Sequence, residues 1–159
     1  MKLYRGRNLC AYMATIMECK HVKECKRKAE IWQENQEKYS AIGQHELDDF
    51  LELYDDKKAA IKMDQHFEKR CVERAISTSD VTSILEFGWV IERNETLGNV
   101  SVVLLGFTGK PYKPLHVVYH IVSERKWVAV TAYRPISQPW KWSKNYDKRI
   151  CFCVKDGEL

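Results

Sequence analysis

Two histidines, His116 and His120, interrupt an otherwise apolar and β-branched run at residues 114–122. If this run is a β-strand, side-chain alternation places both histidines on one face. The opposite face is fully apolar and is expected to contact the core; it comprises Leu115, Val117, Tyr119 and Ile121. The histidine face is half polar, so we expect it to meet a cleft or solvent, where chemistry is possible.

The next run, residues 126–135, is expected to pair with the first as an antiparallel hairpin. If residues 124 and 125 form the turn, His116 lies opposite Tyr133. This register, which we prefer, also pairs Ser123 with Lys126, Val118 with Thr131 and His120 with Ala129, and it turns Val128, Val130 and Ala132 toward the core. A one-residue slip instead turns Trp127, Ala129, Thr131 and Tyr133 inward. The slip brings Arg134 near His116, so either register places an imidazole beside a phenol or a guanidinium.

Histidine, tyrosine and arginine are the side chains that cleavage of a phosphodiester without a metal ion requires. A neutral imidazole can take the proton from a ribose 2′-hydroxyl, and His116 is the candidate. A second donor must protonate the leaving 5′-oxygen, and an arginine such as Arg134 can stabilise the phosphate oxygens. Each residue also has a structural reading, because a lone strand histidine is commonly a packed or exposed residue and Pro135 can simply end the strand. The combination favours a site that includes Tyr133.

A basic and aromatic segment follows the hairpin. Its candidate substrate-binding residues are Trp140, Lys141, Trp142, Lys144, Lys148 and Arg149. Basic side chains can neutralise phosphates, and aromatic faces can stack on bases. The alternative is a solvated C-terminal arm whose tryptophans pack onto the domain. The sequence leaves both readings open.

The cysteines were tested against the ligand patterns of zinc sites. Cys19, His21 and Cys25 form a loose C-x-H-x3-C cluster, and Cys151 and Cys153 form a second pair. The second pair fits alternation along a strand better than a zinc knuckle, and the first two cysteines would not share a face of a helix. The spacing therefore predicts no metal and no cofactor. We expect a cytoplasmic protein, and its cysteines are then expected to be reduced and structural.

Helices are expected in the first half of the chain. Residues 9–39 contain no Pro or Gly, and residues 40–43 are expected to break this helix. Further helical runs are expected at residues 43–63, 64–76 and 81–87. Ser77 to Asp80 reads as a capping box, and Gly88 as the C-cap of the last helix.

Strands are expected in the second half. They are predicted at residues 89–93, 99–107, 114–122 and 126–135, with a possible fifth at 149–154. Four sequential strands with short links favour an antiparallel meander. The fold class is therefore α+β, with the helices packed on one face of an antiparallel sheet of four to five strands.

The composition is that of a soluble globular protein. The 159 residues are 45% hydrophobic and 30% charged, with a net charge of +4 that is too small to argue for nucleic acid by itself. The apolar run at residues 9–17 superficially resembles a signal peptide but lacks a small-residue cleavage pattern. No run reaches the length of a membrane span, so we expect no membrane association. A nucleotide-binding Gly loop and a nucleophile elbow are also missing from the sequence.

Several of these segments together resemble a widespread bacterial family, a domain of unknown function. The resemblance covers residues 64–149 and is carried by the helical pair His66 and Arg70, the strand Leu115 to Val118, and the strand residues Thr131, Tyr133 and Pro135. That family is grouped with the ribonuclease-toxin fold of barnase, RelE and the EndoU nucleases. The resemblance implies a barnase/RelE-like domain at 64–159, and it implies that His66 and Arg70 join His116 and Tyr133 in one cleft. Residues 1–63 are then a helical N-terminal extension.

The function expected from the residues and the resemblance together is a metal-independent, toxin-like endoribonuclease. His116 is the candidate general base or acid with His66 as its partner, Arg70 and Arg134 bind the phosphate, and Tyr133 donates a hydrogen bond or proton. RNA is the expected partner, with an antitoxin or another protein bound through the N-terminal helices. The alternative is a non-catalytic module that binds nucleic acid or protein on a degenerate toxin fold.

Overall fold

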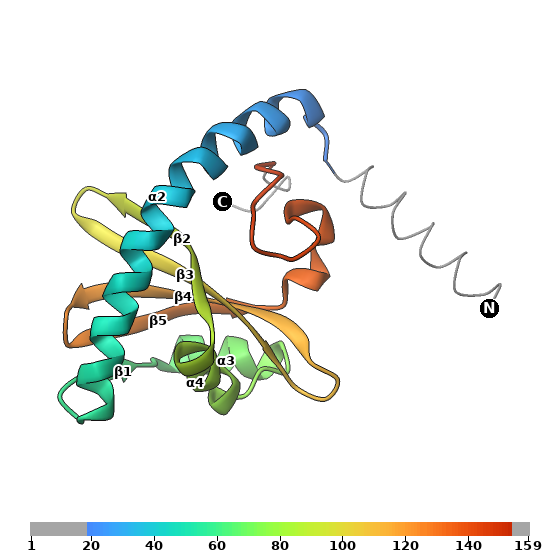
Figure 1. The fold of residues 1–159 in the computed structure, drawn as a ribbon. Helices are drawn as coiled ribbons and strands as arrows, with labels where there is room; N and C mark the ends of the chain where they lie inside the picture. The colour runs from blue at the N-terminus through green and yellow to red at the C-terminus, as the bar shows by residue number, and fades with distance from the viewer. Residues whose placement is uncertain (1–18, 154–159) are drawn as a thin grey trace. The chain divides into compact units, whose positions relative to one another are not determined.

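The computed structural model describes residues 19–153 of the chain (Figure 1). Contacts divide the chain into two compact units, Asn35–Arg134 and a second unit of Met1–Glu34 with Pro135–Leu159. We call the first the sheet unit, and the described part of the second, residues 19–34 and 135–153, the terminal unit. The predicted domain boundary between residues 63 and 64 stays a prediction. The run at residues 9–17 lies outside the described residues.

The elements follow the predicted order, helices before strands. The helices are α2 (Val22–Asp55), α3 (Gln65–Glu73) and α4 (Thr78–Phe87), with short 3-10 helices η1 (Pro135–Ser137) and η2 (Pro139–Lys141). The strands are β1 (Ala60–Lys62), β2 (Trp89–Thr96), β3 (Asn99–Thr108), β4 (Lys113–Ser123) and β5 (Lys126–Tyr133). Among the described residues, no helix is both long and apolar enough to cross a membrane.

One predicted helix break is wrong, because α2 continues through residues 40–43 without interruption. Gly43 lies where the helix approaches the sheet. A Cβ atom at this position would lie 2.9 Å from Val90 Cγ1 and 3.2 Å from Val102 Cγ1. The glycine therefore permits close packing of helix on sheet and does not end the helix.

The predicted fifth strand also differs from the observed one. The sheet order is β1-β5-β4-β3-β2, so the predicted meander of four strands is confirmed. The fifth strand is β1, parallel to β5, in a segment that was expected to be helical. The preceding helix, α2, ends at Asp55 and not at residue 63 as predicted, and Lys57 just after it has a φ of 60°. Residues 151–153 are not a strand, and Arg149 forms only an isolated bridge with Trp142.

The preferred hairpin register is confirmed at both ends of β4 and β5 and fails between them. His116 pairs with Tyr133, Val118 with Thr131, and Ser123 with Lys126, but Tyr119 pairs with Ala129 and His120 with Val128. An extra residue on β5, Val130, forms a bulge there and is 52% exposed. A bulge shifts the side-chain alternation by one residue. The core face of β5 is consequently Trp127, Ala129 and Ala132, a mixture of the two registers considered.

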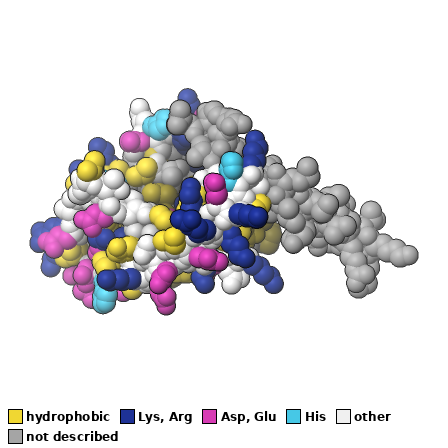
Figure 2. Space-filling model, turned by 90° about the horizontal axis from the view of Figure 1, so that it is seen from above, with side chains coloured by type: hydrophobic (Ala, Val, Ile, Leu, Met, Phe, Trp, Pro, Cys, Tyr) yellow, Lys and Arg dark blue, Asp and Glu magenta, His cyan; other side chains and the backbone are white. Residues whose placement is uncertain are grey.

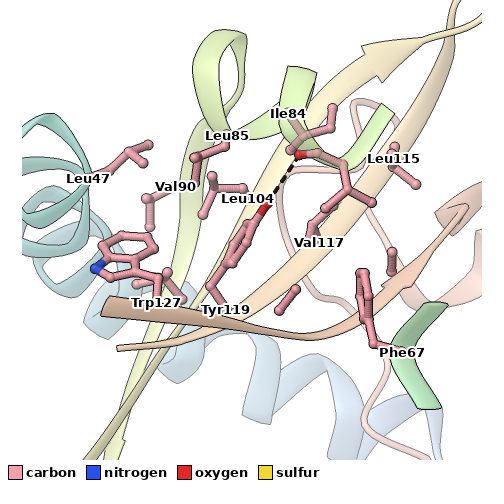
Figure 3. Packing of buried hydrophobic residues seen from close by; sticks show 14 of the residues in the cluster. Leu47, Phe67, Ile84, Leu85, Val90, Leu104, Leu115, Val117, Tyr119 and Trp127 are labelled. Atoms are coloured by element: carbon pink, nitrogen blue, oxygen red, sulfur yellow. Dashed lines mark hydrogen bonds between the residues drawn. The ribbon is translucent and has the colours of Figure 1, made fainter. Parts of the chain in front are cut away.

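A single apolar cluster holds the sheet unit together (Figure 3). It joins the apolar face of β4, as predicted, to buried residues of all three helices. Phe50 of α2 stacks on Trp127 with ring centroids 4.7 Å apart. All three helices therefore pack on the same face of the sheet, which confirms the predicted α+β arrangement.

The predicted caps of the two short helices form, although α3 ends at Glu73, before the predicted Ile76, and α4 begins at Thr78, before the predicted Val81. Asp64 caps α3 by accepting a hydrogen bond from the amide of Phe67, at 2.8 Å. Ser77 and Asp80 form the predicted capping box of α4. The amide of Gly88 donates to the carbonyl of Ile84 at the end of that helix. These caps fix α3 and α4 at defined angles above the sheet.

A buried hydroxyl in this core offers a stability test. The Tyr119 hydroxyl donates to the carbonyl of Val81 at 3.1 Å (Figure 3), and burial raises the pKa of Tyr119, so the phenol stays protonated. Tyr119→Phe should lower the free energy of unfolding by about 1 kcal/mol, because a buried hydrogen bond is lost. Urea unfolding followed by circular dichroism measures this. Tyr112→Phe is the matched control, since Tyr112 is 79% exposed and should change nothing; equal stabilities of the two variants would contradict the prediction.

Candidate functional site

The predicted pair of His116 and Tyr133 forms at the end of the β4–β5 hairpin. His116 Nδ1 lies 3.3 Å from the Tyr133 hydroxyl, and the rings meet edge to face with centroids 5.3 Å apart. The expectation that the histidine face meets a cleft or solvent is wrong at His116, whose side chain has no exposed surface. Tyr133 is half-buried, so it is the more accessible member of the pair.

An arginine that the sequence analysis did not single out reaches the same stretch of β5. Arg74 follows α3 directly and donates to the Thr131 hydroxyl at 3.2 Å and to the Ala132 carbonyl at 2.7 Å. Thr131 and Tyr133 are two residues apart on a strand, so their side chains share a face. Arg74 is exposed. We call His116, Tyr133, Thr131 and Arg74 the β5-edge site.

The predicted helical pair, His66 and Arg70, forms on α3. Arg70 Nε donates to His66 Nε2 at 3.2 Å, and both side chains are exposed. The buried residues of α3, Phe67 and Cys71, contact the core face of the sheet. His116 projects from the other face, because Leu115 and Val117 on either side of it belong to the core. The cleft expected to join His66 and Arg70 with His116 and Tyr133 stays a prediction.

The comparison with known families matches the part of the chain that contains the segments carrying the resemblance. Residues 63–134 match the family described as a domain of unknown function, DUF4258. This part of the chain is a DUF4258 domain. No curated protein and no solved structure matches the chain. The DUF4258 domain contains the whole β5-edge site and also His66 and Arg70.

Arg134 is the last residue of the DUF4258 domain, and its guanidinium makes structural contacts. Its guanidinium donates to the Thr108 hydroxyl at 3.0 Å and to the Lys113 carbonyl at 3.1 Å, and it lies 3.8 Å from the Asp80 carboxylate. Only 19% of the side chain is exposed. These contacts join the β3–β4 loop to the start of α4 and fit a structural role for Arg134, in place of the predicted contact with phosphate.

The basic and aromatic segment lies in the terminal unit, after the DUF4258 domain. Trp142 is 4% exposed, and the Arg149 guanidinium covers its ring at 4.7 Å from the centroid. Lys144 and Lys148 are exposed, whereas Lys141 and Trp140 are half-buried. These contacts favour the packing alternative for Trp142, because no face of its ring is open for stacking on a base.

The two cysteine pairs whose spacing did not indicate a metal site converge in the terminal unit. The sulfur atoms of Cys19, Cys25, Cys151 and Cys153 all lie within 4.8 Å of one another. The spacing argument against a metal assumed a helix and a strand, and both assumptions are wrong. Cys19 precedes α2, and Cys151 and Cys153 lie in irregular backbone. His21 is exposed and is not part of the cluster.

Protonation differs among these thiols. Burial raises the pKa of Cys25 and that of Cys151. Partial burial of Cys153 acts in the same direction, but hydrogen bonds from the other thiols and from the backbone of Lys20 and His21 lower its pKa to about 7. The cluster thus stabilises negative charge on one of its sulfur atoms.

Proposed function

We propose that the DUF4258 domain of this protein is an endoribonuclease that acts at the β5-edge site without a metal ion. The observation that carries the proposal is the convergence of an imidazole, a phenol and a guanidinium on one stretch of β5. His116 contacts the Tyr133 hydroxyl, and Arg74 is held beside them through Thr131. The resemblance to ribonuclease toxins supports RNA as the substrate class.

Cleavage at this site would be a transesterification. The ribose 2′-oxygen attacks the neighbouring phosphorus, the bond from phosphorus to the 5′-oxygen breaks, and the products carry a 2′,3′-cyclic phosphate and a 5′-hydroxyl. Tyr133, the more accessible member of the pair, donates its proton to the leaving 5′-oxygen. The phenolate regains a proton from Nδ1 of the doubly protonated His116, and solvent reprotonates the imidazole before the next turnover. A water molecule takes the proton of the 2′-hydroxyl. Arg74 binds the phosphate oxygens, whose charge increases in the transition state.

This assignment differs from the one expected from the sequence. His66 and Arg70 are given no role in this proposal, because they contact each other and α3 packs on the face of the sheet opposite to His116. Arg134 is a structural residue, and Arg74 replaces it at the phosphate. From the same resemblance we propose that the protein is a toxin. Its partner protein would bind to the residues of this chain that precede the DUF4258 domain.

The role of Arg74 is the direct test of the proposal. Arg74→Gln should slow cleavage by about 100-fold, since it removes the cation that binds the transition-state phosphate. Arg70→Gln is the matched control, because Arg70 is an exposed arginine of the same helix and should cleave at the wild-type rate. Cleavage of total RNA in buffer without added divalent cations, read on denaturing gels with analysis of the 2′,3′-cyclic phosphate ends, measures both. Equal cleavage rates for the two variants, or a wild-type protein that cleaves no RNA, would contradict the proposal.

One observation favours a non-catalytic binding module as the second candidate, because the His116 side chain has no exposed surface. A binding module for nucleic acid would retain RNA without turnover, with an affinity that falls steeply as salt rises. Among the described residues on the face shown in Figure 2, Lys and Arg side chains lie among Asp and Glu. The cleavage assay and a salt titration of RNA binding separate the two candidates.

A further inference from the structure

Two segments far apart in the sequence bring four sulfur atoms together in the terminal unit. Cys25 Sγ lies 3.5 Å from Cys153 Sγ, and Cys19 Sγ lies 4.0 Å from the same atom. Cys151 completes a group in which all four sulfurs lie within 4.8 Å of one another. Cysteine side chains are ordinarily buried singly among hydrocarbon, so a group of four facing one another calls for a common ligand.

These separations match one tetrahedral ion. Zinc binds thiolate sulfur at about 2.3 Å, which places the four sulfurs of a tetrahedral site about 3.8 Å apart. The observed 3.5 Å and 4.0 Å lie on either side of this value. A disulfide instead requires sulfurs about 2.05 Å apart. All four of these cysteines are free thiols in the structure.

The backbone holds the first two sulfurs around the start of a helix. α2 begins at Val22, so Cys19 lies in the preceding loop and Cys25 in the first turn. The amide of Cys25 donates to the carbonyl of His21 at 2.8 Å, a hydrogen bond of the first helical turn, so the helix starts between the two cysteines. Both sulfurs therefore face the same side, although a continuous helix would have separated them.

The second pair is held by the residue between its members. The amide of Phe152 donates to Cys25 Sγ at 3.4 Å, and the Phe152 ring packs edge to face on Trp32 with centroids 5.5 Å apart. Amide groups that donate to ligand sulfurs are the outer contacts that orient and stabilise metal thiolates. The Cys-Phe-Cys segment is therefore fixed at Phe152, its central residue, and a cysteine precedes and follows this residue.

The described residues of the terminal unit also contain little regular structure that could hold its two segments together. Its described residues contain the first turns of α2, two short 3-10 helices and one isolated bridge. A unit as small as this buries too little apolar surface to be stable alone, and metals or disulfides commonly supply the rest. A cavity of about 520 Å³, lined in part by Cys19, Cys25 and Cys151, opens beside the sulfurs and gives an ion a path to them.

We propose that Cys19, Cys25, Cys151 and Cys153 bind one structural Zn²⁺ ion as a tetrahedral four-thiolate site. Four thiolates select zinc or iron, and iron–sulfur clusters separate their ligand sulfurs more widely than a single ion does. The four ligands leave no open position for water or substrate, so the ion joins the two segments and takes no part in a reaction. This site is independent of the β5-edge site and of RNA cleavage.

Metal content of the full-length protein tests the site. Protein purified under reducing conditions without chelators should contain one zinc per chain by inductively coupled plasma mass spectrometry. Cys153→Ser should lose more than nine-tenths of it, and so should Cys25→Ser. His21→Ala and Cys71→Ala are the matched controls and should keep it, because His21 is exposed and Cys71 lies in the core of the sheet unit. Wild-type protein with no bound metal, or control variants that lose as much zinc as the ligand variants, would overturn the proposal.

A second measurement uses only the wild-type protein and so does not depend on whether the variants fold. Wild-type protein refolded with Co²⁺ should show the intense near-ultraviolet absorption of cobalt–thiolate bonds and the visible bands of tetrahedral cobalt. Titration of the refolded protein with Zn²⁺ should abolish both. Iron in place of zinc in the purified protein, absence of the cobalt bands, or an intact mass that reveals disulfides among the four cysteines would each contradict a zinc site.

Discussion

A fragment of residues 63–134, the span that matches DUF4258, should fail to fold, whereas a fragment of residues 35–134 should unfold cooperatively. The shorter fragment lacks β1, which pairs with β5. It also lacks the second half of α2, which supplies Leu47 and Phe50 to the core at 0% and 1% exposure. Without it, Trp127 loses the ring that stacks on it at 4.7 Å. Gly43 also allows the helix to approach β2 and β3 closely, so that the sheet face beneath it becomes exposed when the helix is removed.

The magnitude follows from the two side chains. Truncation of one buried Phe or Leu to Ala in a core costs about 2–5 kcal/mol, and a domain of this size has only about 5–15 kcal/mol in total. Removal of the whole helix half exceeds this margin. Far-ultraviolet circular dichroism with urea titration of both fragments measures the outcome.

A point variant within the longer fragment gives the matched control. Phe50→Ala in residues 35–134 should lower the free energy of unfolding by about 3–5 kcal/mol. Tyr39→Ala should change it by less than about 0.5 kcal/mol, because Tyr39 is 42% exposed on the same helix. A cooperative urea transition of the 63–134 fragment would show that the family segment is a self-sufficient domain and would refute the prediction.

Local sequence signals predicted much of the sheet unit. Alternation in residues 114–122 identified the core face of β4, and the capping residues Asp64 and Ser77 identified the starts of α3 and α4. These features depend on neighbours within a few residues. β1 has three residues and pairs with a strand more than sixty positions away, so local pattern carries no signal for it. The bulge at Val130 is likewise set by packing across the sheet, since Trp127 and Ala132 both turn inward only if the strand gains a residue between them.

The candidate site was predictable where it depends on one hairpin and unpredictable where it depends on packing between distant elements. His116 and Tyr133 face each other because alternation and turn position fix cross-strand neighbours. Which face of the sheet α3 covers is a tertiary outcome, so the expected meeting of His66 with His116 did not follow from spacing. Arg74 had one available signal, its position four residues after Arg70. For the sulfur cluster, the sequence supplied both cysteine pairs but not their convergence, because a loop before a helix and an irregular C-terminal segment have no periodicity that places them.

His116 and Tyr133 should behave as one functional unit in RNA cleavage, which a double-mutant cycle can reveal. Tyr133→Phe removes the hydroxyl that is 3.3 Å from His116 Nδ1, and His116→Gln removes the imidazole while keeping a polar side chain of similar size. Each variant should slow cleavage by about 100-fold, the usual effect of removing a proton-transfer group. The double variant should be no slower than the slower single variant, because each substitution already interrupts the same proton path.

Burial of His116 makes a structural control necessary. His116 has no exposed surface, so His116→Gln can lower stability as well as rate. Thermal unfolding of each variant must therefore show a folded protein at the assay temperature, and Tyr112→Phe serves as the control for loss of a phenol at an exposed position. A purely structural role for His116 would lower the fraction of folded protein and leave the rate per folded molecule unchanged. Multiplication of the two single effects in the double variant would mean that the residues act separately, and the proton path through Tyr133 would be excluded.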